Sequence, residues 1–299
     1  MFQRLGSAAA IMALALLGGS GTAAAMPEAD ARAAEVQRAP VSTGVLDVAH
    51  RGASAYAPEN TLAAIDAAHE HEATTVELDV QRSKDGELVI VHDTTLARTT
   101  DAEEVFPDRA PYNVADFTMK EMRRLDAGSW FDSAYADERI PTLQEALQRL
   151  REHDMNLLLE IKSPALYPGI EGDIAEALSN APDWLTGARA GGPDRLTIQS
   201  FDWMSTKRSH DRLPSVPHGL LGLVPEDQID DYAAWADQIN PNHTTIDADY
   251  VEKVHEADME VLTYTVNNAD DMRSAIGMGV DGIISDYPDV LRKVIAEER

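Results

Sequence analysis

Three acidic residues occur inside two apolar runs of the sequence. Glu77 and Asp79 alternate with apolar residues in "ATTVELDVQ" (73–81), and Glu160 lies near the end of "MNLLLEI" (155–161). Residues two apart on a strand point to the same face, about 7 Å apart. Carboxylates that share a buried face repel one another and resist the loss of water unless a cation lies between them. Three hard oxygen ligands predict a site for one divalent cation, Ca²⁺ or Mg²⁺.

The opposite orientation of the same strand is an alternative. Glu77 and Asp79 would then lie on an outer face, and Val76, Leu78 and Val80 would fill the interior of the sheet. In a parallel barrel the outer face is itself covered by helices, so that orientation also buries charge.

Two histidines follow short apolar runs at positions close to these acids. His50 comes after "VLDVA" (45–49), and His92 comes after "ELVIV" (87–91). A single histidine at a strand end is more often structural, but two beside a metal cluster can serve as general acid and general base. The other seven histidines fall on helical stretches, at a strand start or in a loop, and we interpret them as packing or surface residues.

Two basic residues stand at the same strand ends. Arg51 follows His50 directly, and Lys162 is two residues after Glu160. Their structural role would be to neutralise the charge of the carboxylates. Their functional role is to hold an anionic group, Arg51 through a two-pronged contact and Lys162 as a point charge. A metal with two such cations is a usual arrangement for stabilising charge on a phosphoryl group.

The elements that must position these residues alternate between strand and helix patterns. Apolar and β-branched runs predict strands, helical spacing predicts helices, and Asp85-Gly86 predicts a tight turn between 73–81 and 87–91. The predicted barrel strands are 45–49, 73–81, 155–161, 195–199, 217–221, a weak one near 243–246, 259–265 and 281–285, and the predicted helices are 59–72, 142–152, 170–180, 202–211, 227–237, 248–257, 268–277 and 288–297.

Eight strand–helix units over residues 45–299 predict a (β/α)8 TIM barrel. Regular alternation of this kind implies parallel strands with right-handed crossovers. An open doubly wound sheet is the alternative, but the sequence has no glycine-rich nucleotide fingerprint after any predicted strand. The segment 93–141 does not follow the strand–helix alternation and predicts a small insertion after the second strand. It should carry one helix, with a capping box of Thr118 and Glu121 and a stop at Gly128.

The first 44 residues have a different composition. Arg4, an apolar run and Ala23-Ala24-Ala25 are typical of a secretory signal peptide over 1–25, and 26–44 is expected to be a flexible leader. A membrane anchor is the alternative, but the apolar run has roughly half the ~20 residues of a membrane span. We therefore expect a secreted or periplasmic protein with no stable membrane anchor. The chain has no cysteine, which excludes disulfides and a lipidated cysteine.

The chain is strongly acidic, with a formal net charge of -27. This field repels nucleic acid, so a phosphate group must be met by local cations or a metal. Nothing in the sequence implies a protein partner.

With these residues in place, the sequence resembles the glycerophosphodiester phosphodiesterase family, in its secreted bacterial type. The motifs that carry the resemblance run from about residue 45 to residue 290. They are "AHRGASAYAPENTLAAI", "VELDVQRSKDGELVIVHDTTLARTT", "RIPTLQEAL", "LLLEIKSP", "TIQSF", "TYTVNN" and "GVDGIISDYP".

The resemblance implies metal-dependent hydrolysis of a small glycerophosphodiester to sn-glycerol 3-phosphate and an alcohol. It implies His50 and His92 as the acid/base pair, and Arg51 and Lys162 as phosphate contacts. It also implies one metal held by Glu77, Asp79 and Glu160.

One residue departs from the family pattern. Members often have Trp where Tyr264 stands. Tyr264 keeps an aromatic wall and is expected to contact the substrate, but its added hydroxyl leaves the contacts with the head group open. Two routes remain open, attack by the glycerol hydroxyl through a cyclic phosphate and direct attack by water.

Two other functions fit the same residues. The first is a phospholipase D-like enzyme on intact lipid, for which Phe106, Phe117, Trp130 and Phe131 of the insertion would form an apolar channel. The second is a non-catalytic binder of cell-wall glycerophosphodiesters, which would not require an acid/base pair.

Overall fold

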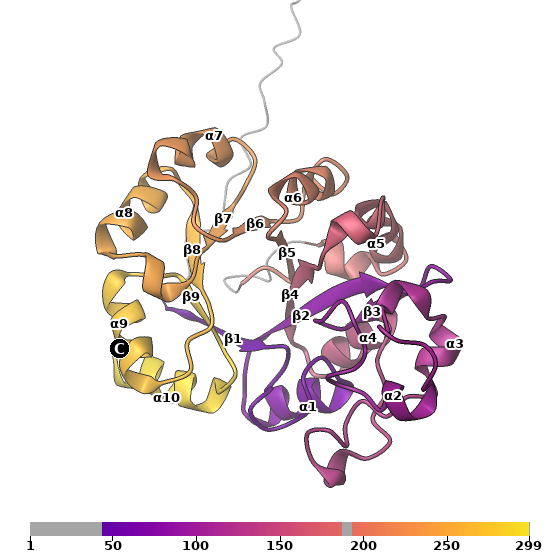
Figure 1. Cartoon of the computed structure of the whole chain (residues 1–299). Helices are drawn as coiled ribbons and strands as arrows, with labels where there is room; N and C mark the ends of the chain where they lie inside the picture. Colours follow the sequence, from indigo (N-terminus) through magenta and orange to yellow (C-terminus); the bar gives the residue numbers. More distant parts are fainter. Residues whose placement is uncertain (1–43, 187–192, 299) are drawn as a thin grey trace, which may run out of the picture. The chain divides into compact units, whose positions relative to one another are not determined.

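The computed structural model describes residues 44–186 and 193–298, which form a closed ring of parallel strands (Figure 1). The predicted signal peptide 1–25 and residues 26–43 of the predicted leader lie outside the described residues. The ring closes where β1 pairs with β2, and it runs β1-β9-β8-β7-β6-β5-β4-β2. The barrel strands are β1 Leu46–His50, β2 Thr75–Arg82, β4 Asn156–Ile161, β5 Leu196–Ser200, β6 His218–Leu221, β7 Gln238–Asn240, β8 Glu260–Thr263 and β9 Gly282–Ser285.

Helices surround the ring (Figure 1). A ninth strand, β3 Leu88–Ile90, pairs antiparallel with β2 and lies outside the closed ring. The predicted (β/α)8 TIM barrel with an insertion after the second strand is therefore confirmed. The helices between barrel strands are α1 Leu62–Glu70, α4 Leu143–Glu152, α5 Ile170–Ser179, α6 Trp203–His210, α7 Ile229–Ala233, α8 Ala248–Glu256 and α9 Ala269–Met278, and α10 Pro288–Glu297 follows the last strand.

Strand alternation separates two layers of side chains. Val76, Leu78 and Val80 are completely buried and belong to the apolar layer between the ring and the helices. Their neighbours Glu77 and Asp79 must therefore point into the barrel, because successive side chains on a strand face opposite ways. The alternative orientation of β2 is wrong. A separate small apolar cluster belongs to the other strand face and contains Val48, Leu158, Leu262 and Ile284.

The predicted strand near 243–246 is also wrong. The seventh barrel strand is β7, Gln238–Asn240, and His243–Thr245 forms a 3-10 turn. Two of the three residues of β7 are amides that bond across strands, Gln238 to Glu260 and Asn240 to Gln199. A strand of this length with polar side chains has no apolar alternation that could reveal it in the sequence.

The insertion 93–141 is built differently from the single helix that was expected. It contains two four-residue helices, α2 Ala102–Val105 and α3 Met119–Met122. The capping box of Thr118 and Glu121 is present, but α3 ends at Met122 rather than at Gly128. A Cβ at Gly128 would lie 1.9 Å from the carbonyl oxygen of Tyr135, so this glycine permits a close backbone approach.

Among residues 44–186 and 193–298, no helix is both long enough and apolar enough to cross a membrane.

Candidate active site

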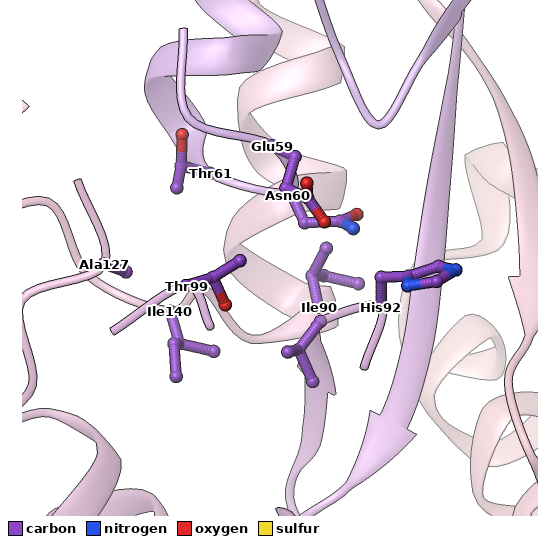
Figure 2. Close-up of a pocket in the computed structure, with 9 residues that line it drawn as sticks. Glu59, Asn60, Thr61, Ile90, His92, Thr99, Ala127 and Ile140 are labelled. Carbon is purple, nitrogen blue, oxygen red and sulfur yellow. The ribbon is translucent and has the colours of Figure 1, made fainter. Parts of the chain in front are cut away.

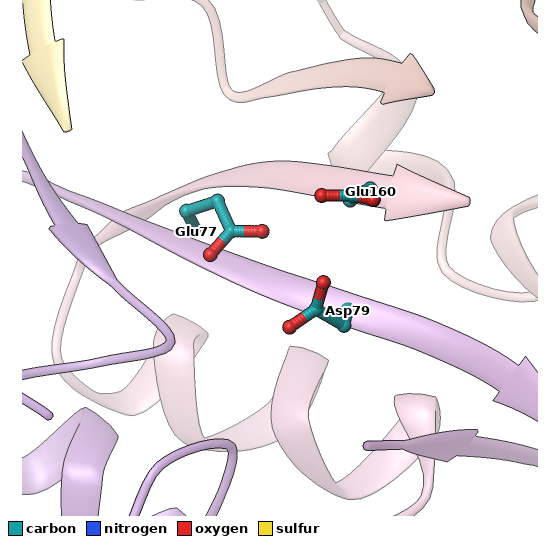
Figure 3. Close-up of side chains that lie close together, drawn as sticks. All are labelled: Glu77, Asp79 and Glu160. Atoms are coloured by element: carbon teal, nitrogen blue, oxygen red, sulfur yellow. The ribbon is translucent and has the colours of Figure 1, made fainter. Parts of the chain in front are cut away.

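Three buried carboxylates meet inside one end of the barrel (Figure 3). Glu77 and Asp79 come from β2 and Glu160 from the neighbouring β4, where Asp79 and Glu160 are register partners. One oxygen of each carboxylate lies within 4.8 Å of the others, and the three residues are 2%, 1% and 7% exposed. Hard oxygens gathered at this spacing form a donor set suited to one divalent cation.

The two strand-end cations contact this cluster. Lys162 Nζ lies 2.7 Å from Glu160 Oε1 and 3.4 Å from Asp79 Oδ1. Arg51 Nε lies 3.5 Å from Asp79 Oδ2, and the Arg51 backbone N–H donates to Glu77 Oε2 at 3.0 Å. Arg51 adopts a left-handed backbone with φ 56, which turns this N–H toward the cluster.

The electrostatics of the three acids differ. Burial, followed by repulsion from Asp79 and Glu160, raises the pKa of Glu77 well above its usual value. Burial and Asp79 raise the pKa of Glu160 to about 7. Burial would also raise the pKa of Asp79, but Lys162 and Arg51 overcome it and lower that pKa. Two monovalent cations therefore do not balance the three charges, and the residues present fit a divalent cation that would stabilise all of them.

His50 lies at the end of β1 and contacts the residue that follows β9. Its Nδ1 is 2.6 Å from Asp286 Oδ1. Asp286 also accepts hydrogen bonds from Ser54 Oγ at 3.0 Å and from Asn267 Nδ2 at 2.6 Å, so its carboxylate is held in place. Because Nδ1 is occupied by this contact, Nε2 is the ring nitrogen left for another partner. A cavity of about 360 Å³ opens here and is lined by His50, Arg51, Ser54, Glu59, Thr265, Asn267 and Asp286.

His92 has the same kind of partner. Its Nδ1 lies 2.7 Å from Oδ1 of Asp93, the next residue in the chain. Burial lowers the pKa of His92, although the charge of Asp79 opposes this effect. Hydrogen bonds from Arg98 lower the pKa of Asp93 to about 2, so Asp93 stays ionised. The neutral imidazole is then held with its Nδ1–H toward Asp93.

A small cavity lies beside His92, Glu59 and Asn60 (Figure 2). Its volume is about 10 Å³, which is room for about one water molecule.

Asn60 has a role that the sequence interpretation missed. Its Nδ2 donates to Asp79 Oδ2 at 2.8 Å, and its Oδ1 accepts the Asp79 backbone N–H at 3.2 Å. Asn60 has φ 58, a left-handed conformation that asparagine tolerates better than most residues. Its place in "AHRGASAYAPENTLAAI", nine residues after Arg51, is the only sequence signal that could have indicated it.

Tyr264 lies just after β8, on the same end of the barrel. Burial and the charge of Glu160 raise its pKa. Its ring meets the edge of Phe201 with centroids 5.8 Å apart, and Lys162 Nζ lies 5.7 Å from the Phe201 centroid. Phe201 is 53% exposed and was not singled out in the sequence. Tyr264 and Phe201 thus form an aromatic wall beside Lys162.

The aromatic residues of the insertion do not all face outward. Phe117 is completely buried in the insertion's own apolar core, and Phe106 packs against it with centroids 5.3 Å apart. Trp130 is 39% exposed and meets Phe131 edge to face. Since two of the four rings build this core, they cannot line the lipid channel that an enzyme acting on intact lipid would need.

Comparison with known proteins identifies the family of this chain. The model of the glycerophosphoryl diester phosphodiesterase family matches residues 50–290. A glycerophosphodiester phosphodiesterase of Caldanaerobacter subterraneus subsp. tengcongensis is 37% identical over 254 residues, which is 84% of this chain and 97% of that protein. A glycerophosphodiester phosphodiesterase of Bacillus subtilis is 33% identical over 264 residues, covering 84% of this chain and 86% of that protein.

A solved structure is similar over the same region. It is a phosphodiesterase of Oleispira antarctica in complex with the product sn-glycerol-3-phosphate, with a TM-score of 0.73 and 28% identity. The match covers 85% of this chain and 97% of that one. This chain therefore belongs to the glycerophosphoryl diester phosphodiesterase family and is an enzyme of that class.

Proposed function

We propose that the protein hydrolyses glycerophosphodiesters to sn-glycerol 3-phosphate and an alcohol. The observation that carries the proposal is the placement of His50 and His92, each with an aspartate on Nδ1, at the barrel end that holds three buried carboxylates. A site that only bound its ligand would need no such pair of proton carriers. The product seen with the Oleispira antarctica relative supports the same chemistry.

The carboxylates Glu77, Asp79 and Glu160 would hold one divalent cation, Ca²⁺ or Mg²⁺. When bound, such a cation supplies Lewis-acid stabilisation of charge on the phosphoryl oxygens. Arg51 and Lys162 bind and orient the phosphate from the same side, since both lie against the cluster.

The two histidines divide the proton transfers. His92 takes a proton at Nε2 from the attacking oxygen, because its lowered pKa keeps the imidazole neutral. In direct attack this oxygen is that of water, and its bond to phosphorus replaces the bond to the alcohol. In the cyclic route it is the glycerol hydroxyl, and water must then open the cyclic phosphate to give sn-glycerol 3-phosphate. His50 donates a proton at Nε2 to the leaving alcohol oxygen, and Asp286, which contacts Nδ1, orients the imidazole ring for this step. Tyr264 and Phe201, whose rings meet edge to face, would contact the alcohol group of the substrate.

Residues 1–25 support a further part of the proposal, that the enzyme is exported and belongs to the secreted bacterial type. An early basic residue, an apolar run and an Ala-x-Ala sequence are the features that signal peptidases recognise. Expression of the full chain in a bacterium should give a mature protein outside the cytoplasm that begins near residue 26. Recovery of the uncleaved chain in the cytoplasm would contradict export.

Release of sn-glycerol 3-phosphate tests the activity on small diesters, and release of choline from phosphatidylcholine vesicles tests the activity on intact lipid. Glycerophosphocholine, glycerophosphoethanolamine and phosphatidylcholine vesicles are supplied separately, with and without EDTA. We expect product from the small diesters, loss of product with EDTA, and recovery when Ca²⁺ or Mg²⁺ is restored. Tight binding of a diester without product would identify a binder, and cleavage of the vesicles alone would identify an enzyme of intact lipid.

A further inference from the structure

A single arginine joins the partners of His92 and Arg51. Arg98 lies in "VHDTTLARTT", and its Nε and Nη2 donate to the two Asp93 oxygens at 2.6 and 3.0 Å. On its other side, Nη1 and Nη2 donate to the two Glu59 oxygens at 2.9 and 2.7 Å. The guanidinium therefore makes a two-pronged contact with each of two carboxylates.

Each of those carboxylates contacts a residue of the proposed site. Asp93 Oδ1 accepts from His92 Nδ1 at 2.7 Å, and Glu59 Oε1 accepts from Arg51 Nη1 at 2.8 Å. The contacts form one continuous path from His92 through Asp93, Arg98 and Glu59 to Arg51. One end of this path moves a proton and the other holds the phosphate.

We propose that Arg98 is a positioning residue that fixes His92 through Asp93 and Arg51 through Glu59 at the same time. This inference rests on the proposed function. The planar guanidinium suits this role because its donors are rigid and can face two carboxylates at once, which a lysine ammonium cannot do with the same geometry.

The insertion supports Arg98 from a third side. The Arg98 guanidinium carbon lies 5.9 Å from the centroid of the Trp130 ring, and Trp130 is fixed by a hydrogen bond from its Nε1 to the carbonyl of Ala127. Arg98 is itself 44% exposed, whereas Glu59 is 13% exposed. Replacement of Arg98 therefore leaves the barrel core untouched, while Glu59 and Asp93 lose their shared partner.

The test is a set of kinetic constants for Arg98→Gln, alone and combined with Asp93→Asn or Glu59→Gln, on glycerophosphocholine. Alone, Arg98→Gln should lower kcat about 10- to 100-fold and raise KM several-fold, as loss of supporting hydrogen bonds typically does. In the Asp93→Asn background Arg98→Gln should leave kcat nearly unchanged, because the amide offers one acceptor oxygen and no charge, so the two-pronged contact is already broken. In the Glu59→Gln background it should leave KM nearly unchanged for the same reason. Additive losses in both backgrounds, or wild-type constants for Arg98→Gln, would overturn the proposal.

Two further variants separate positioning from charge. Arg98→Lys keeps the charge but not the double fork, so it should restore kcat or KM but not both; full recovery of both would overturn the proposal. Arg273→Gln removes an arginine of similar exposure that pairs with Glu297 on the surface, and it should keep both constants. Equal losses in Arg273→Gln would mean that net charge alone is responsible.

A spectroscopic readout follows the same path. Nitrogen NMR of His92 should show the Nδ1–H tautomer in the wild-type protein and a mixture in Arg98→Gln, whereas a purely structural role would leave the tautomer unchanged. Failure of wild-type protein to release sn-glycerol 3-phosphate would contradict the proposed function, and wild-type turnover with unaltered Arg98→Gln kinetics would contradict this inference alone.

Discussion

The Nδ1 atom of His50 lies 2.6 Å from Oδ1 of Asp286, although 236 residues separate the two in the chain. They meet because β1 and β9 are neighbours in the closed ring, with Ala49 and Ser285 as register partners. The contact places a carboxylate behind a proposed proton carrier, the arrangement that orients histidine in many hydrolases. His92 reaches the same arrangement by a local route, through Asp93.

Replacement of Asp286 by asparagine should lower kcat about 100-fold, because the amide no longer fixes the tautomer and orientation of the His50 ring. Release of sn-glycerol 3-phosphate measures the effect. Asp289→Asn is the matched control, since Asp289 accepts from Tyr56 rather than from a histidine. Unchanged kcat in Asp286→Asn would show that His50 needs no such partner.

The metal-free protein should lose stability as the pH rises from about 4.5 to about 7, because the pKa of Glu160 is raised to about 7 in the folded state. Below the ordinary pKa the carboxyl is protonated in both folded and unfolded chains, and above it the folded state resists ionisation. The loss is on the order of 3 kcal/mol for this group. Urea unfolding in EDTA measures it, and Glu160→Gln should show a flatter dependence on pH. An equally steep dependence in that variant would exclude Glu160 as the cause.

Addition of Ca²⁺ or Mg²⁺ should stabilise the wild-type protein by about 3 kcal/mol at 100 times its Kd. Glu77→Gln should abolish most of this gain, because it replaces one of the three charged carboxylate ligands by a neutral amide. Glu171→Gln is the control, since Glu171 is also buried but pairs with Arg208 outside the cluster. Thermal unfolding at several cation concentrations gives the comparison, and an equal cation response in Glu77→Gln would argue against the site.

The acid limb of kcat/KM should lie below pH ~6.5, because burial lowers the pKa of His92 and the base acts in its neutral form. Asp93→Asn should move this limb to still lower pH, since the carboxylate that favours the imidazolium is gone. A pH–rate profile of both proteins tests the assignment. A limb that moves upward in Asp93→Asn would assign the base to another group.

Two phenylalanines should separate stability from substrate preference. Phe117→Ala should lower the free energy of unfolding by about 3–5 kcal/mol, because it empties the core of the insertion. Phe201→Ala should change stability by less than about 0.5 kcal/mol, since the ring is 53% exposed, but should raise KM for substrates with bulky alcohols. Urea unfolding and a head-group panel measure the two effects, and a KM unchanged for every head group would remove Phe201 from the site.

Local patterning sufficed for much of this molecule. Alternation in 73–81 placed Glu77 and Asp79 on one face, and the barrel rule placed His50 at the carboxyl end of the barrel, because parallel strands end on the same side. His92 follows the antiparallel strand β3, so that rule does not place it; it reaches the same end because β3 pairs only with the last residues of β2. The sequence did not predict β7, because this short strand carries two amides and no apolar alternation. Its side chains form hydrogen bonds across the barrel, such as the one from Asn240 to Gln199.

The sequence by itself determined the family, the barrel and the residue types capable of chemistry, since these depend on motifs and periodicity along the chain. The tertiary structure alone decided which charged side chains contact and orient these residues. Asp286 reaches His50 only through ring closure, and Arg98 reaches Glu59 across 39 positions because the insertion folds back over the loop after β1. Such contacts depend on distances between segments remote in sequence, which no local pattern specifies.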